Sequence, residues 1–290
     1  MSADVQTAAA IVNYNSGPDL RLALQSLVDE MGPAWEAVVV DNASADGSAE
    51  IAGEFGARVR LVRNRENVGF GRGVNQAVRA SSAPFVLVMN PDCRLTAGAL
   101  AAMRAELEAH RLCALAGPRV LDPDGSVQGS VRGDPDMLTG LFGRTSPLRR
   151  LMPWLPVSAR NVVQDDAVHR DARSVVVDWV SGACMLVRRD AFEAVDGFDE
   201  RYFLYWEDAD LCRRLRARGY HIRYVPGADV VHRVGQSSRT ARADSIRAFH
   251  ESAYRYYSTH VAPAALSPKR LLARVLLSAR CWLALRHVRS

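Results

Sequence analysis

The chain has 290 residues, 48% of them hydrophobic and 24% charged, which excludes global disorder and suits one catalytic domain with an appendage. Its five cysteines are scattered and form no Cys-x-x-Cys pair, so neither a disulfide framework nor a zinc site is expected. The net charge of +5 is concentrated, because residues 264–290 carry six basic residues and no acid.

Short apolar runs alternate with helical patterns over the first 120 residues. The pattern predicts strands at 8–13, 36–40, 58–62 and 85–89, and helices at 18–31, 46–55, 72–80 and 96–110. Thr96 is expected to cap the last of these helices. Such alternation predicts an α/β fold in which helices cover both faces of a mostly parallel sheet.

Residues 131–172 lose this periodicity and contain four prolines, which is typical of a functional loop or a mobile segment. The remaining elements are expected as strands at 175–180, 183–187, 222–225 and 229–232, and as helices at 207–218, 241–257 and 266–287.

Polar clusters follow three of the predicted strands, at 13–15, 41–42 and 90–92. Ligands of parallel α/β sheets bind at the carboxyl ends of the strands, so these clusters are candidate ligand contacts. Asp92, in the sequence Asn90-Pro91-Asp92, is suited to hold Mg²⁺ or Mn²⁺, which prefer oxygen ligands. The alternative is a turn that closes the strand.

Three carboxylates lie close together at Glu207, Asp208 and Asp210, at the expected start of a helix. The helix dipole favours acids there, which is the structural interpretation. The functional interpretation makes Asp208 a general base, with Glu207 orienting the acceptor. His232 ends a predicted strand, where it is either a packed residue or a second metal ligand beside Asp92.

Two turns could contact a nucleotide. The segment 41–48 is either a capped turn or a base contact through Asp41, which could accept a hydrogen bond from a pyrimidine N–H. The glycine-rich turn at 67–73 is similar to a phosphate cradle, but it lacks both the P-loop Lys and the G-x-G-x-x-G spacing. Arg72 in this turn could neutralise a diphosphate.

In this order the segments resemble inverting family-2 glycosyltransferases of GT-A fold, and within them the bacterial rhamnosyltransferases of cell-envelope polysaccharide synthesis. The segments that carry the resemblance are Ile11-Val12-Asn13-Tyr14-Asn15, the turn 41–48, Asn67-Val68-Gly69-Phe70, Asn90-Pro91-Asp92, Trp179-Val180-Ser181-Gly182-Ala183-Cys184, Asp196-Gly197-Phe198-Asp199 and the run 206–214. Each motif is weak alone, whereas the ordered set is specific.

The resemblance implies a role for each matching residue. Asp208 would be the catalytic base, while Asp92 and His232 would hold the divalent ion. Asn90 replaces the first acid of the family's usual Asp-x-Asp, which leaves the identity of the metal open. The residues implied to bind the nucleotide sugar are Asn13, Asp41, Asn67, Gly69, Arg72, Asn90 and Asp92. Gly182, Trp206 and Glu207 would lie near the acceptor.

The implied domain order is a GT-A domain at 1–263 and a basic C-terminal helix at 264–290. Within the domain, 1–120 would be the nucleotide-sugar half and 121–263 the acceptor half. The implied reaction moves a sugar, L-rhamnose from dTDP-rhamnose by preference, to a hydroxyl of a polyprenyl-diphosphate-linked or polysaccharide acceptor. A UDP-sugar donor and a non-catalytic nucleotide-sugar-binding relative remain as alternatives. A nucleotidyltransferase is disfavoured because residues 13–18 contain no basic residue.

The basic C-terminal segment is amphipathic. One face of the expected helix is apolar, although Arg286 intrudes on it. The face consists of Leu271, Leu272, Val275, Leu276, Trp282 and Leu283. The pattern suits an anionic membrane surface better than nucleic acid, and the stretch 138–159 has a similar character. Packing against the domain and self-association are the alternatives. Neither a signal peptide nor a run of ~18 apolar residues is evident, so we expect a cytoplasmic protein at the inner face of the membrane.

Overall fold

The structure is a computed structural model that describes residues 5–32, 35–134, 173–233 and 242–289. Within these ranges the main sheet has nine strands in the order β3-β2-β1-β4-β10-β6-β11-β5, and β8 also pairs with β11. Its strands are β1 (Thr7–Asn13), β2 (Glu36–Asp41), β3 (Val59–Arg63), β4 (Phe85–Met89), β5 (Cys93–Leu95), β6 (Cys113–Leu121), β8 (Val175–Val177), β10 (Cys184–Arg188) and β11 (His221–His232).

Strands β3, β2, β1 and β4 pair in parallel, and so do β6 and β11. Strand β10 runs antiparallel between β4 and β6 and joins these two parallel groups into one sheet. A small second sheet pairs β7 (Val131–Arg132) with β9 (Trp179–Val180). The expected α/β fold with a largely parallel sheet is confirmed.

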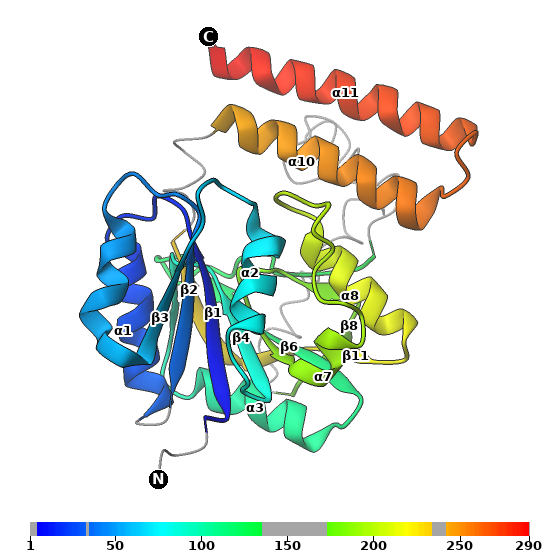
Figure 1. Cartoon of the computed structure of the whole chain (residues 1–290). Helices are drawn as coiled ribbons and strands as arrows, with labels where there is room; N and C mark the ends of the chain where they lie inside the picture. Colours follow the sequence, from blue (N-terminus) through cyan, green and yellow to red (C-terminus); the bar gives the residue numbers. More distant parts are fainter. Residues whose placement is uncertain (1–4, 33–34, 135–172, 234–241, 290) are drawn as a thin grey trace.

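Helices cover both faces of the sheet (Figure 1). Helices α1 (Asp19–Met31) and α3 (Ala99–Ala109) pack on one face, and α2 (Phe70–Arg79), α7 (Arg189–Glu193) and α8 (Glu207–Ala217) pack on the other. Successive side chains of a strand point to opposite faces of the sheet, so each strand contributes to the hydrophobic cores on both faces. Ile11 and Val39 contribute to the α1 side and Val12 to the α2 side, all of them buried. Each such side chain stabilises the fold by about 1.5–3 kcal/mol when fully buried.

A pair of helices lies over the carboxyl ends of the parallel strands (Figure 1). Helix α10 (Arg242–Tyr256) is nearer the sheet and continues into a π-helical turn, η3 (Tyr257–Val261). Helix α11 (Pro268–Arg289) runs antiparallel to α10 and is outermost. No helix within the described ranges is both long and apolar enough to cross a bilayer.

Several predicted boundaries were wrong. The helix expected at 96–110 begins at Ala99 after Gly98, and the Thr96 hydroxyl donates to the backbone oxygen of Asp229 (2.9 Å) instead of capping it. The helix expected at 46–55 is a 3-10 helix, η1 (Ser48–Arg58). The strand expected at 175–180 divides into β8 and β9, which belong to different sheets.

Other differences concern the second half of the sheet. The strands expected at 222–225 and 229–232 are one strand, β11, with a register shift between Val225 and Asp229. Strands β5 and β6 were not predicted. The start of the expected loop 131–172 is β7, in which Val131 is only 1% exposed. Residues 135–172 of that loop, which include the stretch 138–159, lie outside the described residues.

Candidate active site

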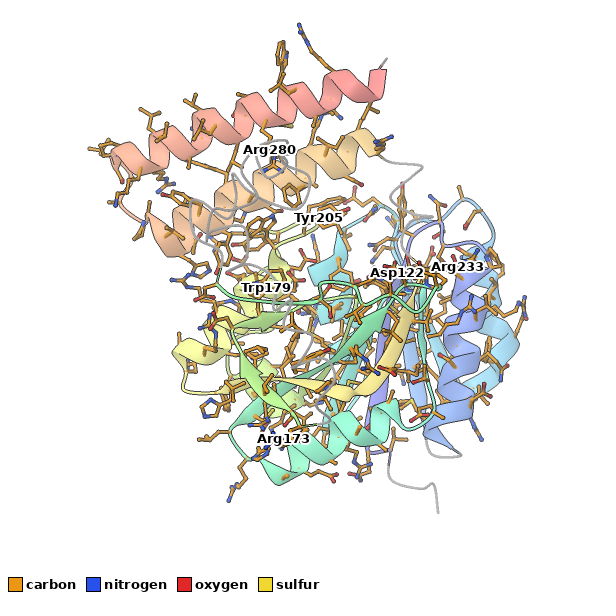
Figure 2. The ribbon with its side chains drawn as sticks, turned by 180° about the vertical axis from the view of Figure 1, so that it is seen from behind. Asp122, Arg173, Trp179, Tyr205, Arg233 and Arg280 are labelled. Carbon is orange, nitrogen blue, oxygen red and sulfur yellow. The ribbon has the colours of Figure 1, made fainter. Side chains whose placement is uncertain are left out.

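A cavity of about 700 Å³ lies at the carboxyl edge of the sheet, beneath α10. This volume is typical of a small-molecule site, and the position is where parallel sheets bind ligands. The cavity is lined by Val12, Tyr14, Asn42, Asn67, Gly69, Phe70, Asn90, Pro91, Asp92, Phe203, Leu204, Tyr205, His232, Asp244, Ser245, Arg247, Ala248 and Glu251. Figure 2 shows Tyr205 between the sheet and helix α10.

Asn42, part of the predicted polar cluster 41–42, organises one wall of the cavity. Its Nδ2 donates to Oδ1 of Asn67 (3.1 Å) and to the backbone oxygen of Gly69 (3.2 Å). Gly69 has φ +90°, and a Cβ there would lie 2.4 Å from the backbone oxygen of Phe203. The turn therefore needs glycine at this position. The predicted contacts Asn67 and Gly69 both line the cavity, so their nucleotide role remains a prediction with suitable geometry.

Asn13 and Asp41 lie beneath the cavity and do not line it. Both are buried, and Asn13 Nδ2 donates to Asp41 Oδ1 (2.7 Å). The second carboxylate oxygen of Asp41 accepts the N–H of Ser44 (3.1 Å). In this structure the pair holds the β1 and β2 ends together, and its predicted contact with a nucleotide remains a prediction.

Arg72 pairs with an acid at the protein surface, and its predicted contact with a diphosphate remains a prediction. Its side chain is 53% exposed on α2 and forms an ion pair with Glu200 (3.5 Å). It is not among the residues that line the cavity. By contrast, Arg247 of α10 does line it and pairs with Asp244 (2.7 Å). The sequence predicted this helix without assigning it a functional role.

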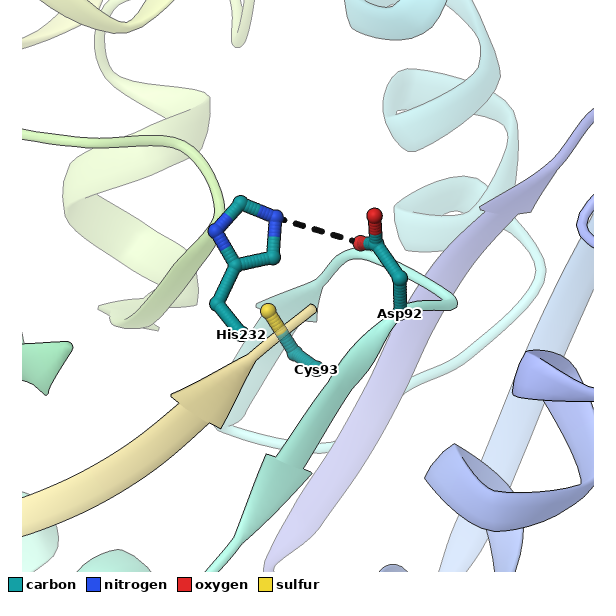
Figure 3. Close-up of side chains that lie close together, drawn as sticks. All are labelled: Asp92, Cys93 and His232. Carbon is teal, nitrogen blue, oxygen red and sulfur yellow. Dashed lines mark ion pairs between the residues drawn. The ribbon is translucent and has the colours of Figure 1, made fainter. Parts of the chain in front are cut away.

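Asp92 and His232 approach each other at the edge of the cavity (Figure 3). Asp92 follows β4 and His232 ends β11, and β11 pairs with β5 through His232 and Cys93. The Asp92 Oδ1 atom lies 3.2 Å from His232 Nε2. Asn90 lines the same region, and its N–H donates to the backbone oxygen of Ala183 (2.8 Å).

Cys93 completes a group whose candidate ligand atoms all lie within 4.8 Å of one another. Burial raises the pKa of its thiol well above the usual range, with Cys184 and Asp92 adding to the effect. The thiol also donates to the backbone oxygen of Ala183 (3.2 Å). A protonated thiol is a poor ligand for a hard cation, so the candidate donors are Asp92 and His232.

The surroundings of Asp92 fit a divalent ion. Oδ1 of Asp92 is buried without a hydrogen-bond partner among the described residues. Leaving a buried carboxylate oxygen unsatisfied costs about 1–3 kcal/mol or more. A divalent cation held by this oxygen and by Nε2 of His232 would satisfy both atoms. These two residues are the ones the sequence selected.

Asp208 lies in the first turn of α8, beside the cavity wall. Its Oδ2 accepts the backbone N–H of Gly182 (2.8 Å). A Cβ at Gly182 would lie about equally close to Asp208 Oδ2 and to the ring of Phe70, each at 3.5 Å. Gly182 thus separates Asp208 from Phe70, which lines the cavity. The structure brings the predicted base and the predicted acceptor contact Gly182 together.

The turn that leads into α8 is strained. Tyr205 and Trp206 have φ values of +67° and +70°, in the left-handed region that bulky residues rarely adopt. Trp206 packs against Phe249 and Tyr256, with ring centroids 5.8 and 5.4 Å apart. Helix α10 therefore holds the strained turn, and such strain is common at functional sites. Trp206 does not line the cavity, so its acceptor role remains a prediction.

Glu207 is only 5% exposed and also lies outside the cavity lining. Burial, and then the Asp208 carboxylate, raise the pKa of Glu207 well above its usual range. Its Oε2 has no hydrogen-bond partner among the described residues. The side chain is thus an interior acid in this structure, and the predicted contact with an acceptor remains a prediction.

The raised pKa gives a testable dependence of stability on pH. A carboxyl group of this kind contributes stability below its unfolded pKa, about 4.3, and loses it as the pH rises toward the folded pKa. We expect Glu207→Gln to gain stability relative to the wild type between pH 5 and 8, by at most about 1.4 kcal/mol per pH unit. Urea denaturation at several pH values measures this. The exposed Glu193→Gln variant should follow the wild type, and parallel pH profiles for Glu207→Gln would contradict the prediction.

Asp210 connects α8 to the C-terminal helices. It is 1% exposed, and its Oδ2 accepts from Nε of Arg214 (2.7 Å), one turn further along α8. Its Oδ1 lies 2.6 Å from His260 Nε2, in η3. Arg213 also donates to the backbone oxygen of His260 (3.1 Å). His260, whose contact spans 50 residues of sequence, was not predicted.

Comparison with known proteins identifies the family. Residues 9–195 match the profile described as glycosyl transferase family 2, and residues 154–288 match that of glycosyl transferase family group 2. The chain therefore belongs to glycosyltransferase family 2. The sequence is 32% identical over 287 residues to the N-acetylglucosaminyl-diphospho-decaprenol L-rhamnosyltransferase of Mycobacterium tuberculosis, covering 95% of this chain and 91% of that protein.

Solved structures show the same fold. GalNAc-T7 with UDP, GalNAc and Mn²⁺ superposes with a TM-score of 0.61 and 14% identity, over 94% of this chain and 54% of that one. The mannosyltransferase PcManGT of Pyrobaculum calidifontis, with GDP-Man and Mn²⁺, superposes with a TM-score of 0.59 and 18% identity. The match covers 97% of this chain and 72% of that one. The protein is a glycosyltransferase of GT-A fold, as the ordered motifs predict.

Proposed function

We propose that this glycosyltransferase moves L-rhamnose from dTDP-rhamnose to a lipid-linked N-acetylglucosamine acceptor, with a divalent metal and with inversion. The similarity to the rhamnosyltransferase of Mycobacterium tuberculosis over 95% of the chain supports the proposed sugar and acceptor, while dTDP as the nucleotide rests on the resemblance of the ordered motifs. The cavity at the sheet edge, with Asp92 and His232 beside it, supports a nucleotide-diphosphate donor and a metal.

The residues divide the chemistry between the two ends of the site. Asp92 and His232 would hold Mg²⁺ or Mn²⁺, which supplies charge stabilisation to the leaving diphosphate when bound. Asp208 would accept the proton of the acceptor hydroxyl. The hydroxyl oxygen would attack the anomeric carbon from the face opposite the breaking C–O bond to the diphosphate. The N–H of Gly182 fixes one carboxylate oxygen of Asp208 and thereby orients the base.

A panel of dTDP- and UDP-sugars tests the donor. Binding and nucleoside diphosphate release would be measured with Mn²⁺, Mg²⁺ or EDTA, in the presence of lipid extract. The proposal expects metal-dependent release from dTDP-rhamnose. Nucleoside diphosphate release from a UDP-sugar alone would show that the donor is this UDP-sugar and not dTDP-rhamnose. Donor binding without nucleoside diphosphate release, whichever acceptor is present, would favour a non-catalytic nucleotide-sugar-binding relative.

We also propose that α11 attaches the enzyme to an anionic membrane surface, where its lipid-linked acceptor lies. Ala273 of α11 is 5% exposed and clusters with Tyr257 and Ala262, so one side of the helix packs on the protein. The opposite side leaves large apolar side chains exposed: Leu271, Leu272, Val275, Trp282 and Leu283. Arg286 stacks on Trp282 at 3.6 Å from its ring centroid.

Charge favours a bilayer as the occupant of this face. Residues 264–290 contain six basic residues and no acid, which complements anionic headgroups. Packing against the domain and membrane contact therefore use different sides of one helix. The division into a catalytic domain at 1–263 and an attachment helix at 264–290 is part of this proposal.

Two charged substitutions test the exposed face. We expect Val275→Glu with Trp282→Glu to weaken binding to phosphatidylglycerol vesicles at least about tenfold, because two apolar side chains no longer enter the interface. A matched control places the same charges at Leu112 and Val176, which are 58% and 56% exposed but belong to the sheet domain. Unchanged vesicle binding in the α11 variant, with a change in oligomeric state on light scattering, would assign the face to self-association.

A further inference from the structure

Gln128 contacts His232 from a segment to which no function has been assigned. It follows the turn after β6, and its backbone N–H donates to the oxygen of Val120 (2.8 Å). Its side-chain Nε2 donates to Oδ1 of Asp122 (2.8 Å) and to the backbone oxygen of His232 (2.9 Å). The side-chain Oε1 lies 3.0 Å from His232 Nδ1. Figure 2 shows Asp122 on this side of the molecule, close to Arg233.

The two partners of Nε2 determine the orientation of the amide. A carboxylate and a backbone carbonyl accept hydrogen bonds and cannot donate them. The NH₂ group of Gln128 must therefore face Asp122 and the carbonyl of His232, which leaves the amide oxygen facing the imidazole. A flipped amide would set its oxygen against two other acceptors and would lose both bonds.

This orientation determines which nitrogen of His232 carries a proton. The amide oxygen is an acceptor, so Nδ1 must donate to it. A neutral imidazole has one N–H, and its Nε2 then presents a lone pair. That lone pair faces Oδ1 of Asp92, which lies 3.2 Å from Nε2. This carboxylate oxygen has no hydrogen-bond partner among the described residues. With a neutral imidazole the two facing atoms are both acceptors, and a divalent ion bound by both would satisfy them; protonation of Nε2 would instead make the pair a His–Asp ion pair.

We propose that Gln128 is a positioning residue that holds His232 in the Nδ1–H tautomer, with Nε2 ready to bind the divalent ion. The inference rests on the metal role proposed for Asp92 and His232. A group that receives the second N–H of a metal-binding histidine typically raises metal affinity 10–100-fold. Asp122 acts through Gln128, because it keeps the amide in the required orientation.

Nuclear magnetic resonance of the metal-free wild type tests the tautomer directly. The chain would be labelled with ¹⁵N-histidine, and the signals of His232 would be assigned by their loss in His232→Ala. At pH 8.5, where an ordinary imidazole is neutral, long-range ¹H–¹⁵N spectra should show protonated Nδ1 and bare Nε2. A predominant Nε2–H tautomer would overturn the inference without requiring any variant of Gln128.

Metal binding tests the consequence. Gln128→Met keeps the side-chain length and removes the amide, so we expect Mn²⁺ affinity, measured by titration calorimetry, to fall about 10–100-fold. Gln25→Met, on the exposed surface of α1, is the matched control and should bind Mn²⁺ like the wild type. Wild-type affinity in folded Gln128→Met would overturn the inference. Wild-type affinity in His232→Ala would instead remove the metal role on which it rests.

Discussion

The variant Asp208→Asn should lose sugar transfer by about 10²–10⁴-fold while it still binds the donor, because removing a general base typically costs this much. The asparagine oxygen can still accept the N–H of Gly182, which donates to Oδ2 of Asp208 at 2.8 Å, so the loop keeps its geometry. The amide cannot take the proton of the acceptor hydroxyl. Steady-state rates with dTDP-rhamnose and lipid acceptor, together with calorimetric donor binding, separate catalysis from binding.

The control for this variant is Glu193→Gln, an equivalent change at an exposed acid of α7. It should retain wild-type transfer. Turnover of Asp208→Asn within about threefold of the wild type would remove Asp208 from the mechanism. Loss of donor binding in the same variant would also contradict the proposed role, because the base is expected to act on the acceptor.

The variant Asp92→Asn should lose transfer by roughly 10²–10³-fold and bind Mn²⁺ more weakly. Charge stabilisation by a metal contributes several kcal/mol to a transition state that expels a diphosphate. Asp92 supplies the candidate carboxylate, and its Oδ1 has no hydrogen-bond partner among the described residues. Mn²⁺ titration calorimetry and rates at saturating Mn²⁺ measure the two effects.

Asp124→Asn is a suitable control, since Asp124 is an exposed acid in the turn after β6 that accepts from Ser126. It should bind Mn²⁺ and turn over normally. Removing the metal with EDTA should abolish sugar transfer by the wild type, and added Mn²⁺ should restore this activity. Full activity in EDTA, or normal Mn²⁺ affinity in Asp92→Asn, would contradict the metal role.

The first half of the fold follows from local pattern. The strand predicted at 85–89 matches β4 residue for residue, because its apolar run lies between Pro84 and Asn90. Strand β6 was not predicted because it contains Gly117 and Pro118, which are typical of turns. Gly117 is in fact a close contact, since a Cβ there would lie 2.7 Å from the side chain of Val180. Pro226 and Gly227 divided β11 in the prediction for the same reason.

The candidate site was predictable where a residue directly follows a strand. Asp92 at the end of β4 and His232 at the end of β11 both lie at the cavity, as strand-end position suggests. The cluster 41–42 was selected as a whole, and only the structure shows that Asn42 lines the cavity while Asp41 does not. The contributions of Arg247, Glu251 and His260 depend on how distant helices fold back over the sheet, which periodicity does not encode.

The helix pair above the cavity links two parts of the proposed function. Helix α10 contributes cavity-lining side chains through one surface, and α11 packs against α10 with its apolar face turned outward. Phe249 and Tyr256 of α10 pack against Trp206, just before the proposed base. Membrane attachment through α11 would therefore bring a lipid-linked acceptor close to the helix that holds the catalytic turn.

Inverting, metal-dependent transfer of rhamnose can be read from the product of a single reaction. Purified enzyme would be incubated with dTDP-rhamnose, Mn²⁺ and N-acetylglucosaminyl-diphospho-polyprenol, and the product would be analysed by mass spectrometry and nuclear magnetic resonance. We expect one added rhamnose, linked with anomeric configuration opposite to that of the donor, and no product with EDTA. A product of retained configuration, an equal yield in EDTA, or no transfer from bound dTDP-rhamnose to this acceptor would contradict the proposed function.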